Sequence, residues 1–121
     1  MTAKIIIGAT EDETRMGLVE DGRLMEYLVE RAEENHLVGS IFKGRVCNVV
    51  RGIQAAFIDI GLEQNAFLYL GDKMDVTEGQ SILVQISKDA RGTKGPTATR
   101  EVTLPGKYVV LLPYASYIGV S

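Results

Sequence analysis

The chain has 121 residues, 45% of them apolar and 24% charged, which is enough for one folded domain or for a small domain with part of a second. Its net charge of −3 argues against a nucleic-acid-binding protein as a whole, but residues 1–37 carry −5 and residues 38–121 carry +2, so the second unit could approach a phosphate backbone. With one cysteine, one histidine, no apolar run long enough to cross a bilayer and no signal peptide, the sequence excludes an internal disulfide, argues against a Cys/His zinc site and predicts a cytoplasmic protein.

The N-terminal unit is predicted to be an antiparallel β-meander. Three short runs rich in β-branched and apolar residues, 5–7, 14–19 and 24–29, are separated by turn signals. Between the second and third runs, Asp21-Gly22 suits a type I′ hairpin turn, because both central residues of that turn take positive φ. The polar stretch 31–36 then joins the two units, and one helical turn could form there.

From residue 40 onward, four predicted strands show an alternating sequence: 42–51, 55–60, 65–70 and 81–87. Successive side chains of a strand point to opposite faces, so the alternation separates a core face from a surface face. The predicted core face holds Phe42, Gly44, Val46, Asn48, Val50, Ala56, Ile58, Ile60, Ala66, Leu68, Leu70, Ile82, Val84 and Ile86. The opposite face of the first strand holds Lys43, Arg45, Cys47, Val49 and Arg51.

Phe57 and Phe67 fall on the outward faces of neighbouring predicted strands. Phe57 shares its face with Asp59, and a carboxylate without a partner is costly to bury, so this face is expected to contact water. Aromatic rings next to cations hold single-stranded nucleic acid, since bases stack on the rings while the cations follow the phosphates. Phenylalanine is also a common core residue, and the alternation alone leaves base stacking and core closure equally open.

The remaining segments are connections and a C-terminal tail. Residues 71–79 form a polar connection, residues 88–96 form a basic loop with Lys88, Arg91 and Lys94, and residues 108–112 are a last β-rich run. Neither the acidic triplet 11–13 nor the loop 92–95 predicts a ligand site. Consecutive acids in a loop are usually solvated, and the loop departs from the Walker pattern because Pro96 follows it.

Several short motifs of the second unit stand in the order and spacing of a known domain. The motifs Gly44-Arg45-Val46, Ala56-Phe57-Ile58-Asp59-Ile60-Gly61, Asn65-Ala66-Phe67-Leu68 and Glu78-Gly79-Gln80, followed by residues 82–86, resemble the S1 domain pattern. The resemblance implies a five-stranded OB-type barrel. It also implies that Phe57 and Phe67 face single-stranded RNA, in agreement with their outward assignment.

Motifs over nearly the whole chain are similar to the N-terminal part of the ribonuclease E/G family of endoribonucleases. They are residues 4–8, 41–44, 55–57, 87–95 and 106–113. The resemblance implies that the meander belongs to an RNase H-like subdomain into which the S1 domain is inserted, and that Lys94 contacts RNA. It further implies that Gly106 and Val110 begin a sensor that holds a 5′-monophosphate through backbone contacts.

The sequence thus predicts a mainly β chain with a partial RNase H-like meander at 1–37, an S1 domain at 38–103 and the start of the sensor at 104–121. The residues expected to bind single-stranded RNA are Phe57, Phe67, Lys94, Lys43, Arg45 and Arg91. No catalytic or metal-ligating residue is expected in this chain, because the motifs that hold Mg²⁺ and Zn²⁺ in the family are absent from it.

The implied partners are single-stranded RNA, in RNA processing and decay, and the missing catalytic region of a parent ribonuclease. Two other functions stay open at this point. One is a stand-alone OB-type RNA-binding module, and the other is an assembly element that contributes the interface of a homo-oligomer.

Overall fold

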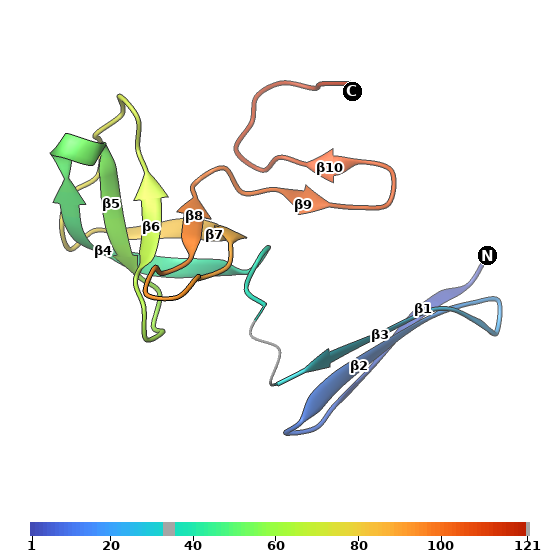
Figure 1. Cartoon of the computed structure of the whole chain (residues 1–121). Coiled ribbons are helices and arrows are strands. Elements are labelled where there is room, and N and C mark those ends of the chain that lie inside the picture. The colour runs from blue at the N-terminus through green and yellow to red at the C-terminus, as the bar shows by residue number, and fades with distance from the viewer. Residues whose placement is uncertain (33–35, 121) are drawn as a thin grey trace. The chain divides into compact units, whose positions relative to one another are not determined.

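The structure is a computed structural model that describes residues 1–32 and 36–120 and separates the chain into two compact units, Met1–His36 and Leu37–Ser121 (Figure 1). Nearly all of the regular structure in these residues is strand, as the sequence predicts. The helical turn considered for residues 31–36 falls on residues 33–35, which lie outside the described residues. The predicted division between residues 103 and 104 lies inside the second unit and stays a prediction.

The first unit is a three-stranded antiparallel sheet of β1 (Ala3–Ala9), β2 (Glu13–Glu20) and β3 (Arg23–Arg31). Each strand runs one or two residues beyond the predicted run at either end, because the ladder also pairs small and charged residues such as Gly8 with Arg15. Asp21 and Gly22 have φ values of 48° and 78°, which confirms the predicted type I′ turn between β2 and β3.

This sheet has no core of its own. None of residues 1–32 is buried, and Ile5, Ile6 and Ile7 are 59–65% exposed. Both faces carry apolar side chains: Ile5 pairs with Leu18 on one face, whereas Ile6 pairs with Gly17 and Tyr27 lies beyond it on the other. A sheet that is apolar on both faces resembles the interior layer of a larger fold.

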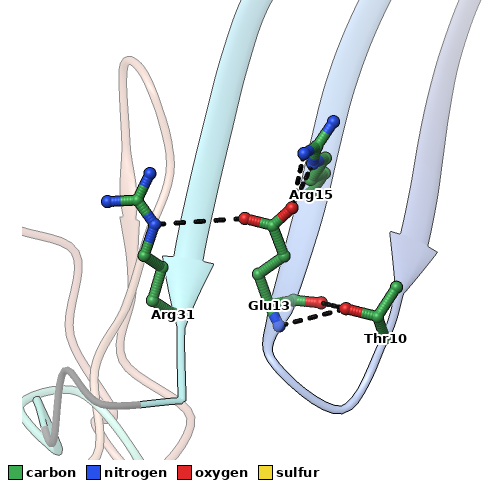
Figure 2. A network of polar contacts seen from close by, with 4 residues as sticks. All are labelled: Thr10, Glu13, Arg15 and Arg31. Carbon is green, nitrogen blue, oxygen red and sulfur yellow. Dashed lines mark hydrogen bonds and ion pairs between the residues drawn. The ribbon is translucent and has the colours of Figure 1, made fainter.

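Polar contacts hold the β1–β2 turn to β3, as Figure 2 shows. The Glu13 carboxylate accepts a 2.6 Å hydrogen bond from Arg15 Nε and lies 4.0 Å from Arg31 Nε. The backbone N–H of Glu13 donates to the Thr10 hydroxyl, which itself donates to the Glu13 carbonyl, both at 3.2 Å. The hydrogen bond and the charge of Glu13 raise the pKa of Arg15. Glu13 is therefore the first residue of β2 and is paired with arginines, so the loop predicted for residues 11–13 ends before it.

The second unit is built around a closed five-stranded barrel, as predicted (Figure 1). Its strands are β4 (Ile41–Val50), β5 (Ala55–Asp59), β6 (Ala66–Tyr69), β7 (Ser81–Lys88) and β8 (Thr97–Thr99). Around the barrel they follow the order β4-β5-β6-β8-β7, with β6 and β8 parallel and every other pair antiparallel. The alternation pattern identified the first four strands. It missed β8, because three residues are too few to show a period.

β4 takes part in both halves of the barrel. Its first half pairs with β7 and its second half pairs with β5, and the change of partner falls at Arg45. At the neighbouring Gly44, an added Cβ would run into the Ile58 side chain and come within 3.0 Å of the Asp59 carbonyl oxygen. Glycine at this position lets β4 approach β5 closely where the barrel closes.

The core inside the barrel consists of Val46, Ala56, Ile58, Ile60, Ala66, Leu68, Leu70, Val76, Val84, Ile86 and Ala98. Most of these residues are on the predicted core face. Val76 is 5% exposed, and Met74 packs against the same cluster, although both come from the connection predicted to be polar. Isolated apolar residues in a polar stretch have no periodicity, so the sequence does not reveal that they cover the core.

A buried side chain ties the two ends of the barrel together. Gln85 on β7 is 7% exposed, and its Nε2 donates to the carbonyls of Gly39, at 3.1 Å, and Thr103, at 3.0 Å. Its Oε1 accepts the Thr103 N–H at 2.8 Å. Gly39 precedes β4 and Thr103 follows β8, so one amide holds the segments through which the chain enters and leaves the barrel.

Short elements complete the second unit. A 3₁₀ turn, η1 (Arg51–Ile53), joins β4 to β5, and a two-stranded hairpin of β9 (Leu104–Pro105) and β10 (Val110–Leu111) follows the barrel. The β-rich run predicted at 108–112 is therefore a strand only in its centre. In the β6–β7 connection, Asp75 accepts a 2.9 Å hydrogen bond from Arg100, which lowers the pKa of Asp75.

We expect Gly44→Ala to lower the free energy of unfolding by about 1–3 kcal/mol, because the new methyl group must displace Ile58 or part β4 from β5. Urea denaturation of the chain measures the loss. Gly52→Ala is the matched control, since a Cβ at Gly52 meets nothing within 4 Å. Equal stabilities for the two variants would show that the close approach at Gly44 is not a constraint.

Candidate nucleic-acid interface

A row of side chains crosses the outer surface of the barrel. Paired residues of neighbouring strands point to the same face, and the register pairs Asn48 with Phe57, Phe57 with Phe67, Phe67 with Thr97 and Thr97 with Lys88. The row runs over all five strands, from β4 through β5, β6 and β8 to β7. We call these five residues the aromatic row.

Phe57 and Phe67 are the centre of the aromatic row. Their ring centroids lie 5.9 Å apart at an interplanar angle of 72°, an edge-to-face pair. Both rings are partly exposed and stay outside the core cluster, whereas Ala56 and Leu68, their neighbours in sequence, point into it. The predicted outward assignment is confirmed, and neither ring belongs to the core cluster.

A β-bulge at Cys47 changes the predicted faces of β4. The ladder pairs Val46 with Ile58 and then Asn48 with Phe57, so Cys47 is an extra residue without a partner. Beyond it the alternation reverses. Asn48 is exposed in the aromatic row and Val49 packs on the core, so the inward prediction for Asn48 and Val50 and the outward one for Val49 are wrong. Bulges commonly re-aim side chains in this way.

A second bulge, at Ser87, acts on β7. Ile86 pairs with Ala98 and Lys88 pairs with Thr97, so Ser87 is the extra residue. Simple alternation would put Lys88 on the inner face with Ile86, whereas the bulge puts it outside, at the end of the aromatic row. The sequence predicts Lys88 only as part of a basic loop. Neither bulge contains a glycine or proline that could have indicated it.

The loop with Lys94 and Arg91 lies against the start of β6. Arg91 and Lys94 exchange backbone hydrogen bonds of 3.0 and 2.9 Å and form a tight turn. The Phe67 N–H donates to the Pro96 carbonyl at 2.8 Å, and Gln64 Nε2 donates to the Gly92 carbonyl at 3.4 Å. These bonds hold the turn of Lys94 beside the strand that carries Phe67.

A close backbone contact fixes the same loop. A Cβ added to Gly95 would run into the carbonyl oxygen of Asn65 and lie 3.2 Å from its carbonyl carbon. Asn65 is two residues before Phe67, so the glycine lets the loop pack directly onto the β5–β6 turn. The position of Lys94 therefore depends on the residue that follows it.

The other predicted cations are more dispersed. Arg45 pairs with Asp59, two rungs from the aromatic row, and is exposed, as predicted. Lys43 is exposed too, but it pairs with Leu83 in the β4–β7 half of the barrel. Arg51 lies in η1 and not in β4. Asp59, for its part, accepts the Gly61 N–H at 2.8 Å and closes the β5–β6 turn.

The predicted sensor residues lie in the β9–β10 hairpin. The Gly106 N–H donates to the Val109 carbonyl at 2.8 Å, and Val110 pairs with Pro105 and is 56% exposed. The hairpin brings the two residues to the same end of one small sheet. The Gly106 N–H is already bonded within the hairpin, so a phosphate contact through it would have to replace that bond.

In the described residues 1–32 and 36–120, no group of three or more His, Cys, Asp or Glu side chains is arranged to hold an ion. Cys47 is a free, exposed thiol.

No helix in the described part of the chain is long and apolar enough to cross a membrane.

The barrel is of the OB type, and relatives of the chain define its family. No family model matches the chain. Ribonuclease G of Escherichia coli strain K12 is 41% identical over an alignment of 142 residues that covers 100% of this chain and 29% of the relative. Ribonuclease G of Haemophilus influenzae is 40% identical, with 98% and 28% covered. Ribonuclease E of Buchnera aphidicola from Acyrthosiphon pisum is 34% identical, with 96% and 15% covered.

The chain spans less than a third of the length of these relatives and corresponds to their N-terminal part. It belongs to the ribonuclease E/G family. The family predicted from the sequence motifs is thereby confirmed.

We expect Gly95→Ala to displace the Lys94 loop and break the bond from Phe67 N–H to Pro96. Hydrogen exchange at the Phe67 amide should become faster, and unfolding should cost about 1–3 kcal/mol less. Thr93→Ala, at the exposed tip of the same loop, is the control and should change neither quantity. Unchanged protection of the Phe67 amide in Gly95→Ala would contradict the described packing.

Proposed function

We propose that this chain is the part of a ribonuclease E/G-type endoribonuclease that holds single-stranded RNA, and that the aromatic row is the surface that holds it. The row supplies stacking through Phe57 and Phe67. In this proposal, cleavage belongs to the rest of the enzyme. The enzyme would act in RNA processing and decay in the cytoplasm.

The observation that carries the proposal is the partly exposed pair of phenylalanines at the centre of the row. Both rings lie outside a fully formed core and stay partly exposed. Stacking of a base on such a ring contributes about 1–3 kcal/mol and tolerates any base. This chemistry suits an enzyme that must hold many different RNA sequences.

The cations around the row support the same proposal. Lys88 lies at one end of it, the loop of Lys94 and Arg91 packs beside β6, and Arg45 lies two rungs away on β4. These positive charges flank the two rings, so the phosphates of a strand whose bases stack on the rings would pass near them. Lys43 is expected to contribute only long-range attraction, because it lies in the β4–β7 half.

The β9–β10 hairpin is proposed as the beginning of a 5′-monophosphate sensor, with Gly106 and Val110 offering backbone groups. Both residues belong to one short hairpin, which supports their acting together. The remainder of such a sensor would come from another part of the enzyme.

Binding of a fluorescent oligouridylate to the chain tests the proposal. We expect Phe57→Ala and Phe67→Ala each to weaken binding by about 1–3 kcal/mol, because each removes one stacking surface. Lys94→Ala should reduce the slope of log K against log salt by about 0.7, the value for one phosphate on a single strand.

Tyr27→Ala is the matched control, since Tyr27 is an exposed aromatic residue on the first unit. The rings of Phe57 and Phe67 lie outside the core, so thermal unfolding should show that both variants stay folded. Wild-type affinity in both phenylalanine variants would rule out the aromatic row as the binding surface.

The meander favours a second role, as an assembly element. Its two apolar faces have no cover among residues 1–32, where Ile5 and Ile6, on opposite faces, are each more than half exposed. Such a sheet gains stability by packing against other strands or helices. Those partners would come from the rest of the parent enzyme or from a second copy of this chain.

Sedimentation of the isolated chain at increasing concentration tests this role. We expect self-association, and we expect the double variant Ile5→Lys and Ile7→Lys to abolish it, because buried charge disfavours an apolar contact. Ser81→Lys, on the exposed start of β7, is a control that should leave association unchanged. A wild-type chain that stays monomeric would remove the self-association form of this role.

A further inference from the structure

We propose that Tyr69 is a third base-stacking position, which extends the RNA surface from the Phe57–Phe67 pair toward the β4–β5 end of the barrel. This inference rests on the proposed function and adds a subsite to the same surface. Its ligand is a nucleobase of the single-stranded RNA held on the aromatic row.

The position of Tyr69 in β6 is the first observation that supports this inference. Tyr69 follows Phe67 by two residues, so both side chains point outward, with their Cα atoms about 6.6 Å apart along the strand. Its partner across the ladder is Ala55, which is two residues before Phe57. The tyrosine is 63% exposed, although its strand neighbours Leu68 and Leu70 are buried. An aromatic surface thus continues along β6 beyond the phenylalanine pair.

Hydrogen bonds hold the Tyr69 side chain in place. Its hydroxyl donates to Gln54 Oε1 at 3.3 Å, and Gln54 Nε2 donates to Asp72 Oδ1 at 3.3 Å. Gln54 caps η1 in the left-handed region, with φ of 51°, so the β4–β5 turn itself sets the position of this amide. An exposed ring that is already ordered loses little conformational entropy when a ligand stacks on it.

The local charges indicate a base as the ligand and argue against a phosphate. The Asp72 carboxylate lies at the end of the hydrogen-bonded chain from the Tyr69 hydroxyl, where it would repel a phosphate. An uncharged aromatic base meets no such repulsion. Tyr69 is also continuous with the aromatic row, so a strand that stacks on Phe67 reaches it without leaving the barrel surface.

The absence of tryptophan from the chain allows a direct test. In Tyr69→Trp, an oligouridylate of about twelve nucleotides, within the size range of an OB-fold site, should quench the single tryptophan as a base stacks on it. Tyr27→Trp, on the first unit, is the control and should keep its emission. Adding Phe67→Ala to Tyr69→Trp should move the quenching to higher RNA concentration.

Affinity gives a second measurement. Tyr69→Ala should weaken binding of the same oligonucleotide about fivefold or more, the lower limit for one stacked base. Tyr69→Phe keeps the ring and loses only the bond to Gln54, so its loss should be smaller. If Tyr69→Ala does not fold, as judged by circular dichroism, the quenching of Tyr69→Trp alone decides whether a base stacks at this position.

The results separate this inference from the proposed function. Unchanged tryptophan emission of Tyr69→Trp at saturating RNA, with binding still weakened by Phe67→Ala, would overturn the third position and leave the proposed function standing. Wild-type affinity in Phe67→Ala, Phe57→Ala and Tyr69→Ala together would overturn both. Quenching of the tryptophan in Tyr69→Trp, with loss of affinity in Tyr69→Ala, supports the third position.

Discussion

Closure of the barrel depends on β8, a strand of only three residues. Thr97–Thr99 pairs in parallel with β6 on one side and antiparallel with β7 on the other, and without it these two strands would leave open edges. The same pairing brings the loop before β8 against β6, through the bond from the Phe67 N–H to the Pro96 carbonyl. The pairing of β8 therefore both closes the barrel and holds the Lys94 loop beside the aromatic row. The hydrogen bonds that complete the barrel also build the proposed RNA surface.

Much of this arrangement follows from residue alternation. The period of two predicted the inner and outer faces of β5 and β6, and with them the outward position of Phe57 and Phe67. It failed where the structure departs from strict alternation: at the bulges of Cys47 and Ser87, in β8, and at Val76, which covers the core from a connection. It also gave no sign that Gln85 is buried, because the segments that cover it come from outside the barrel strands. These features depend on contacts between distant residues, which the pattern of one strand cannot show.

The two units differ in what they require from the rest of an enzyme. The barrel surrounds a core of its own, so its outer surface is available for a ligand. The meander has apolar side chains on both faces and no buried residue among 1–32, so its stability must come from other parts of the protein. This difference agrees with a chain that matches its relatives over less than a third of their length. The charge distribution follows the same division, with the negative charge concentrated on the meander.

The hydrogen bonds of Gln85 to Gly39 and Thr103 have a consequence for the entropy of folding. If the segment between Gly39 and Thr103 were flexible, bringing its two ends together would cost the closure entropy of a long loop, which grows with the logarithm of loop length. Gln85 Nε2 lies about 3 Å from both the Gly39 and the Thr103 carbonyl oxygens, so the folded barrel begins and ends at nearly one point. The chain therefore enters and leaves the barrel at points no farther apart than the two ends of a tight turn. The ends of the chain that enter and leave such a barrel are held together almost as if the connection between them were a few residues long.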